Sequence, residues 1–364
     1  MNNARAGSIR VKVVGVGGAG GNALLRMVKG GLRDAEVIAL NTDVQALRKL
    51  NGIYSFAIGP NATKGLGSGG HPDAGRKAIR ESSEQVASLL QGSDMVFITA
   101  GMGGGTGTGA SAVVADLARK QGALTVGVVT LPFSFEGPRR RAVAEQGLYN
   151  LQQKVDTLIT IDNDRLLPSL DGNASLEMAL KAADEVLRQG VQGITDIITV
   201  PGMINVDFAD VKSIMGNGGT AFMAVGEGKG KWASREAAEI AVSNPLFDAP
   251  MQGASGVLFN VTGGKDLTLA QVHEVAEIIR KTARPDANII FGVVQDKKMK
   301  KRVSITLVAT GVVSARSFEE VEPIDDGETA SSSESTNDSV GKILEFSSAN
   351  GHAMAGAGET RKLI

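Results

Sequence analysis

The stretch ITAGMGGGTGTGAS, Ile98–Ser111, consists almost wholly of glycine and threonine between Gly101 and Gly109. An apolar segment precedes this loop and a run of small residues follows it. Each glycine adds about 0.5–1 kcal/mol to the entropic cost of folding relative to alanine, so stability alone does not explain this loop. The apolar residues before it predict a buried strand, and GASAVVADLARKQG predicts a helix after it. Glycines at such a junction expose backbone N–H groups that bind phosphate. A flexible linker is the weaker interpretation, because ordered elements flank the loop.

A second glycine loop, GVGGAGGN at Gly15–Asn22, follows the apolar run Ile9–Val16 and precedes the helical pattern NALLRMVKGGL. It fits the G-x-G-x-x-G fingerprint of dinucleotide-binding folds in its expected context between a strand and a helix. A tight turn without a ligand is the alternative. One pyrophosphate needs one such loop, so two loops at the carboxyl ends of parallel strands suggest a longer phosphate chain held from two sides. The GGGTGTG loop is not a Walker A motif, because no Lys followed by Ser or Thr ends it.

A nicotinamide-dependent oxidoreductase is the first alternative function. It needs an acidic residue at the end of the second strand to bind the ribose 2′-OH. That strand ends ALNTD, where Asn41 comes first and Asp43 follows two residues later, so this test is ambiguous. The GGGTGTG loop argues against a dehydrogenase.

Strand-like and helix-like segments alternate over the first half of the chain, which predicts an open, mostly parallel α/β sheet. A long helical pattern follows, and the strand patterns after it predict a smaller α+β domain. From about Ser317 the chain is acidic, rich in serine and poor in apolar residues, which is typical of disorder. The predicted organisation is a flexible N-terminus 1–8, a nucleotide-binding domain 9–174, a central hinge helix 175–194, an α+β domain 195–312 and a disordered tail 313–364.

Composition excludes several classes of chemistry. The 364 residues include no cysteine and only three histidines, which excludes disulfides, thiol catalysis and Cys-ligated metal and argues against a His-based metal site. The formal net charge of -1 gives no general attraction to nucleic acid or to an anionic membrane. No apolar run reaches the roughly 18–20 residues that span a bilayer, and the N-terminus lacks a signal-peptide pattern. We therefore expect a cytoplasmic protein without a nucleic-acid partner or direct membrane insertion.

Five motifs occur in an order and at a spacing that resemble a known family. They are GVGGAGGN, NTD, GGGTGTG, TLPFSFEGPRRR and NVDFADVKSIM, within a stretch from about Ile9 to Gly311. Together they resemble the FtsZ family of bacterial tubulin-like cell-division GTPases. The resemblance implies a tubulin-like fold, in which a Rossmann-type parallel-sheet GTPase domain is joined by a long helix to a smaller α+β domain. It implies that residues 9–174 bind GTP and GDP.

The same resemblance assigns nucleotide contacts motif by motif. The segment Gly18–Asn22 is similar to the family's phosphate and ribose loop, and GGGTGTG is similar to its phosphate-binding signature. Asn41 and Asp43 match residues near the phosphates and the water shell of Mg²⁺. The contacts implied by these motifs are Gly18, Ala19, Gly20, Gly21, Asn22, Asn41, Asp43, Gly103, Gly104, Gly105, Thr106, Gly107 and Thr108.

Four later residues complete the implied GTP site. Glu136 and Arg140 resemble the family's ribose and nucleotide contacts. Asn163 and Asp184 resemble residues that read guanine, because a carboxylate accepts from two guanine donors that adenine does not offer as a pair. The neighbours Arg139 and Arg141 are expected to be a solvated helix start.

Two positions depart from the family pattern without removing a hydrogen-bonding group. Leu180 stands where the family often has a phenylalanine that stacks on the base, so aliphatic contact would replace stacking and weaken nucleotide affinity. Asp162 stands where the family often has proline before the Asn-Asp pair.

The phosphate loops contain no obvious base to activate water. The candidate catalytic residues are Asn205, Asp207 and Asp210. Asp207 and Asp210 share one face if Asp207 opens a helix, although a capping role for Asp207 alone is the alternative. These acids follow the hinge helix and lie on a different domain from the glycine loops. The resemblance implies that subunits stack head to tail, so that one chain's acids complete the site of the next and the polymer grows as an open filament.

The resemblance also suggests cofactors and partners. GTP or GDP would bind with Mg²⁺ held by phosphate and water, so no protein metal ligand is expected. The partner is a second copy of the chain in a filament at the division site, and the tail segments GKILEF and ETRKLI are weak candidates for docking to division proteins or a membrane tether. A tubulin-like filament that binds GTP but scarcely hydrolyses it is the second alternative, and the intact acids argue against it.

Overall fold

A computed structural model describes residues 9–169, 175–244 and 251–312. The predicted N-terminal segment 1–8 and tail 313–364 lie outside the described residues. The described residues belong to one compact unit, Met1–Val321. The functional division of this unit into domains 9–174 and 195–312 stays a prediction.

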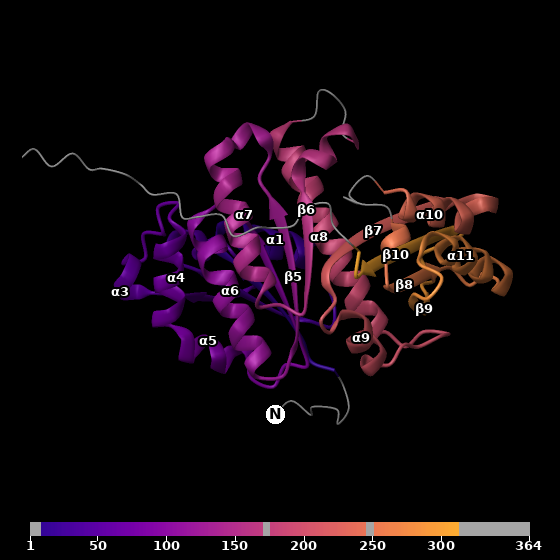
Figure 1. Cartoon of the computed structure of the whole chain (residues 1–364), viewed down its shortest axis with the longest axis horizontal. Helices are drawn as coiled ribbons and strands as arrows, with labels where there is room; N and C mark the ends of the chain where they lie inside the picture. Colours follow the sequence, from indigo (N-terminus) through magenta and orange to yellow (C-terminus); the bar gives the residue numbers. More distant parts are fainter. Residues whose placement is uncertain (1–8, 170–174, 245–250, 313–364) are drawn as a thin grey trace, which may run out of the picture. The chain divides into compact units, whose positions relative to one another are not determined.

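Six parallel strands form the first part of a ten-stranded sheet in the order β3-β2-β1-β4-β5-β6 (Figure 1). This order reverses between β1 and β4, and ligands of open α/β sheets bind at such a switch point, outside the carboxyl ends of the strands. The strands are apolar along most of their length, as expected where helices cover both faces. Their bounds are β1 Val11–Val16, β2 Glu36–Asn41, β3 Tyr54–Ala57, β4 Met95–Gly101, β5 Leu124–Leu131 and β6 Thr157–Asp162.

The helices between these strands pack on two apolar cores. Neighbouring residues of β1 point to opposite faces, so Val13 joins one core with α1 and Val14 joins the other with α4 and α6. Short 3-10 turns follow β5 and β6, at Ser134–Glu136 and Asn163–Ser169. The helices of this part are α1 Gly17–Lys29, α2 Val44–Arg48, α3 Pro60–Thr63, α4 Pro72–Glu81, α5 Ser83–Leu90, α6 Gly105–Lys120 and α7 Pro138–Gln152.

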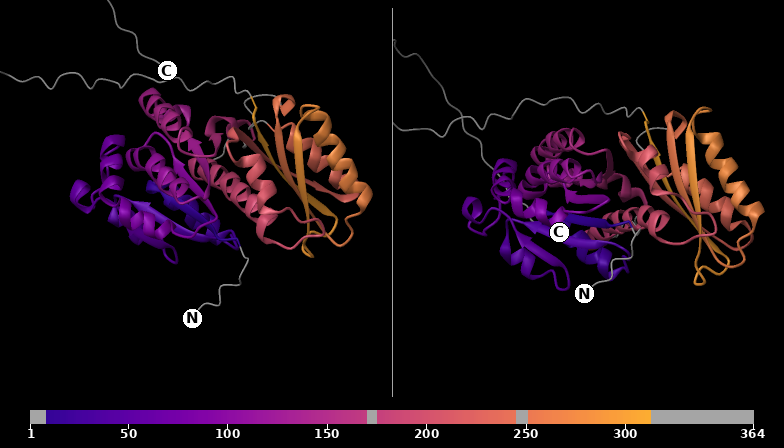
Figure 2. Two further views of the ribbon diagram at one scale, coloured as in Figure 1. Left: turned by 60° about the horizontal axis from the view of Figure 1, so that its bottom comes forward. Right: turned by 90° about the horizontal axis from the view of Figure 1, so that it is seen from below.

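The other four strands continue the sheet in the order β7-β10-β8-β9, with β7 parallel to the start of β6 and β10 antiparallel to β7 and β8. α10 and α11 cover one face of these strands (Figure 2). The elements are α8 Leu176–Thr199, α9 Phe208–Met215, β7 Gly219–Lys229, η3 Gly230–Trp232, α10 Ala233–Val242, η4 Met251–Gly253, β8 Gly256–Gly263, α11 Leu269–Thr282, β9 Asn288–Gln295 and β10 Arg302–Thr310.

Helix α8 crosses the molecule from one edge of the sheet to the other. It begins beside the 3-10 turn η2, Asn163–Ser169, which follows the carboxyl end of β6, and it leads to α9. The end of α9 meets the opposite end of β6, where the Thr157 hydroxyl donates to the Met215 carbonyl. The 24 residues of α8 span about 36 Å at 1.5 Å per residue. The carboxyl edge of the parallel strands is therefore far from α9.

The predicted end of this helix at residue 194 is wrong. The helix continues to Thr199, because Ile194 and Ile197 carry its buried face into the same core. It stops where Pro201 follows, and Val200 has the extended backbone that a residue before proline favours. None of the described helices is both long and apolar enough to cross a membrane.

Burial of Asp196 on α8 makes the protein's stability depend on pH. Desolvation raises the pKa of Asp196, against the lowering effects of a hydrogen bond from Gln192 and the charges of Arg33 and Arg188. Asp34 raises it further. The folded-state pKa exceeds the unfolded value of about 3.9. Ionisation of this carboxyl group therefore leaves the free energy of unfolding unchanged below about 3.9 and lowers it as pH rises through the folded pKa.

We expect Asp196→Asn to raise the free energy of unfolding relative to the parent, and to raise it more at about pH 7.5 than at about pH 4.5. Urea unfolding of both proteins at the two pH values measures this difference. Asp286→Asn is the control, because Arg284 lowers the pKa of exposed Asp286. Removing the Asp286 carboxylate should therefore lower the free energy of unfolding more at the higher pH than at the lower. An Asp196→Asn effect that is independent of pH would contradict the burial argument.

Candidate functional site

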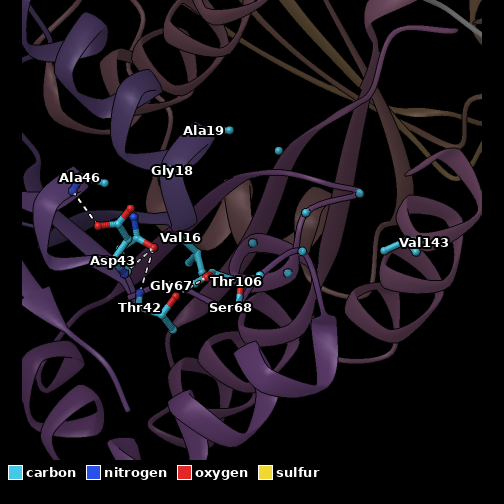
Figure 3. Close-up of a pocket in the computed structure, with 18 of the residues that line it drawn as sticks. Val16, Gly18, Ala19, Thr42, Asp43, Ala46, Gly67, Ser68, Thr106 and Val143 are labelled. Carbon is cyan, nitrogen blue, oxygen red and sulfur yellow. Dashed lines mark hydrogen bonds between the residues drawn. The ribbon is translucent and has the colours of Figure 1, made fainter. Parts of the chain in front are cut away.

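A cavity of about 670 Å³ lies at the carboxyl ends of β1, β2, β4 and β5 (Figure 3). The two predicted glycine loops meet here, and the segments after β2 and β5 complete the wall. Thirteen of the seventeen predicted nucleotide contacts line it or a small adjoining cavity of about 130 Å³. Those in the large cavity are Gly18, Ala19, Asn41, Asp43, Gly103, Gly104, Gly105, Thr106, Gly107, Glu136 and Arg140. Gly21 and Asn22 line the small one, and the remaining four contacts, Gly20, Thr108, Asn163 and Asp184, line neither cavity.

The cavity wall contains two glycines that packing does not require. A Cβ atom built at Gly18 or Gly104 would meet no heavy atom within 4 Å. Neither residue has the positive φ that favours glycine, since Gly104 has φ -96° and ψ 176°. Every other described glycine has a neighbour within 4 Å or a positive φ. The backbone at Gly18 and Gly104 is therefore bare toward open space in the cavity, as close approach of a phosphate requires.

Two predicted contacts instead hold the loops in shape. A Cβ atom at Gly20 would lie 2.5 Å from the Thr99 carbonyl oxygen, so this glycine lets α1 approach β4. The Thr108 hydroxyl accepts a hydrogen bond of 2.9 Å from the Gly103 N–H, and Gly103 has φ +94°. Gly20 and Thr108 thus lie behind the cavity wall and fix the backbone that forms it.

Hydroxyl groups from three segments meet at Thr106. Its Oγ1 atom lies 2.6 Å from the Thr42 hydroxyl and 2.9 Å from the Ser68 hydroxyl (Figure 3). Ser68 belongs to a third glycine-rich loop, GLGSGG at Gly65–Gly70, which forms part of the cavity wall. The sequence analysis missed this loop and Thr42. The density of glycine between Lys64 and His71 was the signal that could have indicated it.

Asn41 and Asp43 line the cavity, but one oxygen of each side chain already accepts hydrogen bonds from nearby backbone N–H groups. The Asn41 Oδ1 atom accepts from the N–H groups of Thr42 and Asp43. Asp43 caps α2, because its Oδ1 atom accepts from Gln45 and Ala46 at 2.8 and 3.0 Å. These bonds fix both side chains beside the loops.

Glu136 and Arg140 form an ion pair on the cavity wall, with 2.9 Å between Oε2 and Nη1. The expectation that Arg139 and Arg141 are a solvated helix start is wrong for Arg141, whereas Arg139 is exposed in the first turn of α7. Arg139 lines the cavity. Arg141 pairs with buried Asp162 at 2.9 Å, and this hydrogen bond is the main cause that raises the pKa of Arg141. A buried carboxylate requires such a partner.

The two predicted guanine-reading residues line neither cavity. Asn163 is buried directly after β6, and its Oδ1 atom has no hydrogen-bond partner among the described residues. Asp184 projects from α8 and forms an ion pair with Arg26 of α1. The same guanidinium donates to the Leu180 carbonyl at 3.3 Å. A buried acceptor without a partner at the carboxyl edge is the kind of group that a ligand satisfies.

The predicted catalytic residues lie together beside α9. Asn205, Asp207 and Asp210 are all exposed, and the Asn205 Oδ1 atom accepts from the Gly202 N–H at 2.6 Å. Asp207 is the N-cap residue of α9, but its side chain makes no capping hydrogen bond. Neither aspartate forms an ion pair within the described part of the chain. Because α9 lies at the far end of α8, these acids are remote from the cavity of their own chain.

Residues that could hold a metal ion are few. The described ranges contain no group of three or more His, Asp or Glu side chains arranged to bind one. Asn41 and Asp43 are among the oxygen-bearing side chains that line the cavity. This set fits an ion whose ligands are mainly phosphate and water.

Comparison with known proteins identifies related chains. Residues 10–171 match the GTPase domain of the Tubulin/FtsZ family, and residues 219–313 match the C-terminal domain of the FtsZ family. An FtsZ dimer from M. jannaschii is 44% identical, with a TM-score of 0.82 over 87% of this chain and 92% of that one. A mutant of FtsZ from M. jannaschii gives 44% and 0.80 over 84% and 92%. CetZ2 from Haloferax volcanii, at 21% identity and a TM-score of 0.72 over 84% and 94%, shares the fold.

Proposed function

This chain belongs to the FtsZ family of tubulin-like GTPases, and from that premise we propose that it polymerises head to tail and hydrolyses GTP at sites shared between neighbouring subunits. The bound nucleotide would occupy the cavity at the carboxyl edge of the sheet. The acids beside α9 would come from the next subunit. Each site would then be complete only inside the polymer.

The cavity supports the nucleotide-binding part of this proposal. The triphosphate would lie against Gly18 and Gly104, where backbone N–H groups face open space. The Thr106 hydroxyl is positioned between two other hydroxyls and would donate to a phosphate oxygen. Mg²⁺, bound mainly to phosphate and water near Asn41 and Asp43, would neutralise charge that develops during phosphoryl transfer. Asn163 and Asp184 would bind guanine, with Arg26 orienting the carboxylate of Asp184.

The observation that carries hydrolysis in trans is the separation of the two halves of the site along α8. About 36 Å of helix lies between the cavity edge and the segment that bears Asp207 and Asp210. A side chain cannot bridge that distance within one subunit. In a head-to-tail pair, Asp207 or Asp210 would accept the proton of the attacking water and Asn205 would help to orient that water. Their carboxylates make no competing ion pair among the described residues.

Exposed apolar residues at both ends support the same assembly. Leu66, 81% exposed, lines the cavity, and Phe135, 63% exposed, lies beside the cavity residue Glu136. At the other end Met203 and Ile204 are exposed next to Asn205. Two different apolar patches at opposite ends fit a heterologous contact that repeats without closing. The FtsZ dimer from M. jannaschii supports self-association of this chain.

The biological role follows from the family. We propose that the filament acts in the cytoplasm at the division site, where it forms the cell-division ring. Division proteins or a membrane tether would bind its C-terminal tail. GDP left at the subunit interface would weaken the filament, so hydrolysis would drive its turnover.

Phosphate release from GTP, measured against protein concentration with Mg²⁺ present, tests the shared site. We expect the rate per subunit to be near zero below a threshold concentration and to rise above it, because an isolated subunit lacks the acids of its neighbour. GTP binding measured below the threshold is the control, and it should be intact. A rate per subunit that is the same at all concentrations would mean that one chain holds a complete site.

A further inference from the structure

Seven exposed lysines gather on the loops at one edge of the C-terminal strands. β7, β8 and β9 end at this edge, because β10 begins there and runs antiparallel to β7 and β8, while β9 is parallel to β8. We call this group the lysine edge. It consists of Lys229, Lys231, Lys265, Lys297, Lys298, Lys300 and Lys301.

Hydrogen bonds join these loops into one surface. The link between β9 and β10 passes over the end of β8, where the Asp296 N–H donates to the Gly263 carbonyl at 2.9 Å. The Lys301 N–H donates to Asp266 in the loop after β8, at 3.1 Å. The Lys301 carbonyl accepts from Gly230, after β7, at 2.8 Å. The lysines of the three loops are therefore held side by side.

The lysine edge carries a local excess of positive charge. None of its seven ammonium groups forms an ion pair with a carboxylate of the described residues. The nearby acids Asp266, Asp296 and Glu236 accept hydrogen bonds from backbone N–H groups, and Glu227 pairs with Arg302. The net charge of -1 for the whole chain hides this asymmetry.

A tryptophan lies in the same surface. Trp232 is the one tryptophan of the chain and is 60% exposed, in the turn after β7. The Lys231 Nζ atom lies 5.2 Å from the centroid of its ring. An indole that remains exposed beside cations presents an apolar body and an N–H donor together, a combination that is enriched where proteins meet the headgroup region of membranes.

We propose that the lysine edge and Trp232 bind the surface of an anionic lipid bilayer. The negative surface potential of such a bilayer attracts each nearby lysine, which favours binding roughly fivefold per residue. Lysine ammonium groups suit headgroup phosphates because they act as point charges and need no fixed fork geometry. The indole would enter the headgroup layer without spanning the membrane. A single-stranded nucleic acid would favour several stacking aromatic rings, whereas this surface has one.

Vesicle binding by the full-length protein in GDP tests the proposal, with Trp232 as an intrinsic fluorescent probe. We expect co-sedimentation with phosphatidylglycerol-containing vesicles, a blue shift of the tryptophan emission, and loss of both at high salt. Phosphatidylcholine vesicles should give neither. Changing Lys297, Lys298, Lys300 and Lys301 together to Gln should weaken binding more than tenfold. The matched control carries Gln at four exposed lysines elsewhere, Lys29, Lys77, Lys120 and Lys281, and should bind like the parent.

The other outcomes overturn the proposal. Equal binding to neutral and anionic vesicles would exclude an electrostatic surface, and equal loss in both lysine variants would assign binding to overall charge. Binding without a change in tryptophan emission would exclude contact at Trp232. Tighter binding to a homopolymeric RNA than to vesicles would assign the surface to nucleic acid. GTP turnover of the variant, measured above the threshold concentration, should match the parent and shows separately that the protein is folded.

Discussion

Asp210→Ala is expected to lower GTP turnover by about a hundredfold to ten-thousandfold while GTP binding and filament formation remain. This is the range that a positioned general base contributes to a reaction. Asp210 is exposed in the first turn of α9 and has no ion-pair partner among the described residues, so its loss should not disturb the fold. Phosphate release, nucleotide binding and sedimentation of polymer, measured on the same preparation, separate these effects.

Glu84→Ala is the matched control for this experiment. Glu84 is an exposed carboxylate in the first turn of α5, a helix of eight residues like α9. Its removal loses the same favourable interaction with the helix dipole, about 0.3–1 kcal/mol, but should leave turnover unchanged. If Asp210→Ala also lost GTP binding, the assignment of this residue to the neighbouring subunit's site would be wrong.

Mixing two inactive variants gives a sharper test of the shared site. Asp210→Ala retains the cavity, and a variant altered in the cavity retains Asp210. In an equal mixture that assembles at random, about one junction in four would combine an intact cavity with an intact acid. We therefore expect activity to return to roughly a quarter of the parent value. No recovery in mixed filaments that sediment normally would contradict hydrolysis across the interface.

The local parts of this site were predictable from the sequence, and the parts that depend on distant contacts were not. The local sequence pattern predicts each strand, the loop after it and the following helix, so both glycine loops were correctly placed at the carboxyl edge of the sheet. The third loop, Gly65–Gly70, lies between short helices rather than after a strand, and so lacked that context. The role of Arg141 depends on Asp162, a residue of β6. No local pattern on α7 identifies that partner.

The sequence also could not separate ligand-facing glycines from packing glycines. Gly18 and Gly20 belong to one motif and look equivalent as letters. In the folded chain the first faces open space, whereas the second lies against the carbonyl of Thr99. That carbonyl comes from β4, far along the chain, so only tertiary structure distinguishes the two roles. In the other loop, Gly104 likewise faces open space, whereas a Cβ atom at Gly107 would lie 2.7 Å from the Gly101 carbonyl oxygen.

Gly104→Ala should therefore weaken GTP binding by roughly tenfold to a hundredfold, or about 1.4–2.7 kcal/mol, without destabilising the fold. Its backbone already has angles that alanine adopts, and a Cβ atom there meets nothing. Replacing glycine by alanine at a compatible position stabilises a protein by about 0.4–1 kcal/mol. The added methyl group would instead occupy the space through which a phosphate approaches the backbone N–H groups. Isothermal titration with GTP and thermal unfolding of the nucleotide-free protein measure the two effects.

Gly20→Ala is the contrasting variant, because its Cβ atom would lie 2.5 Å from the Thr99 carbonyl oxygen. We expect it to lower the melting temperature first and to lose GTP binding only as a consequence. Opposite effects on stability from two Gly→Ala changes in similar loops would identify Gly104 as a ligand-facing position. If Gly104→Ala bound GTP as tightly as the parent, the phosphates could not lie against this loop, and the nucleotide would have to be assigned to another part of the cavity.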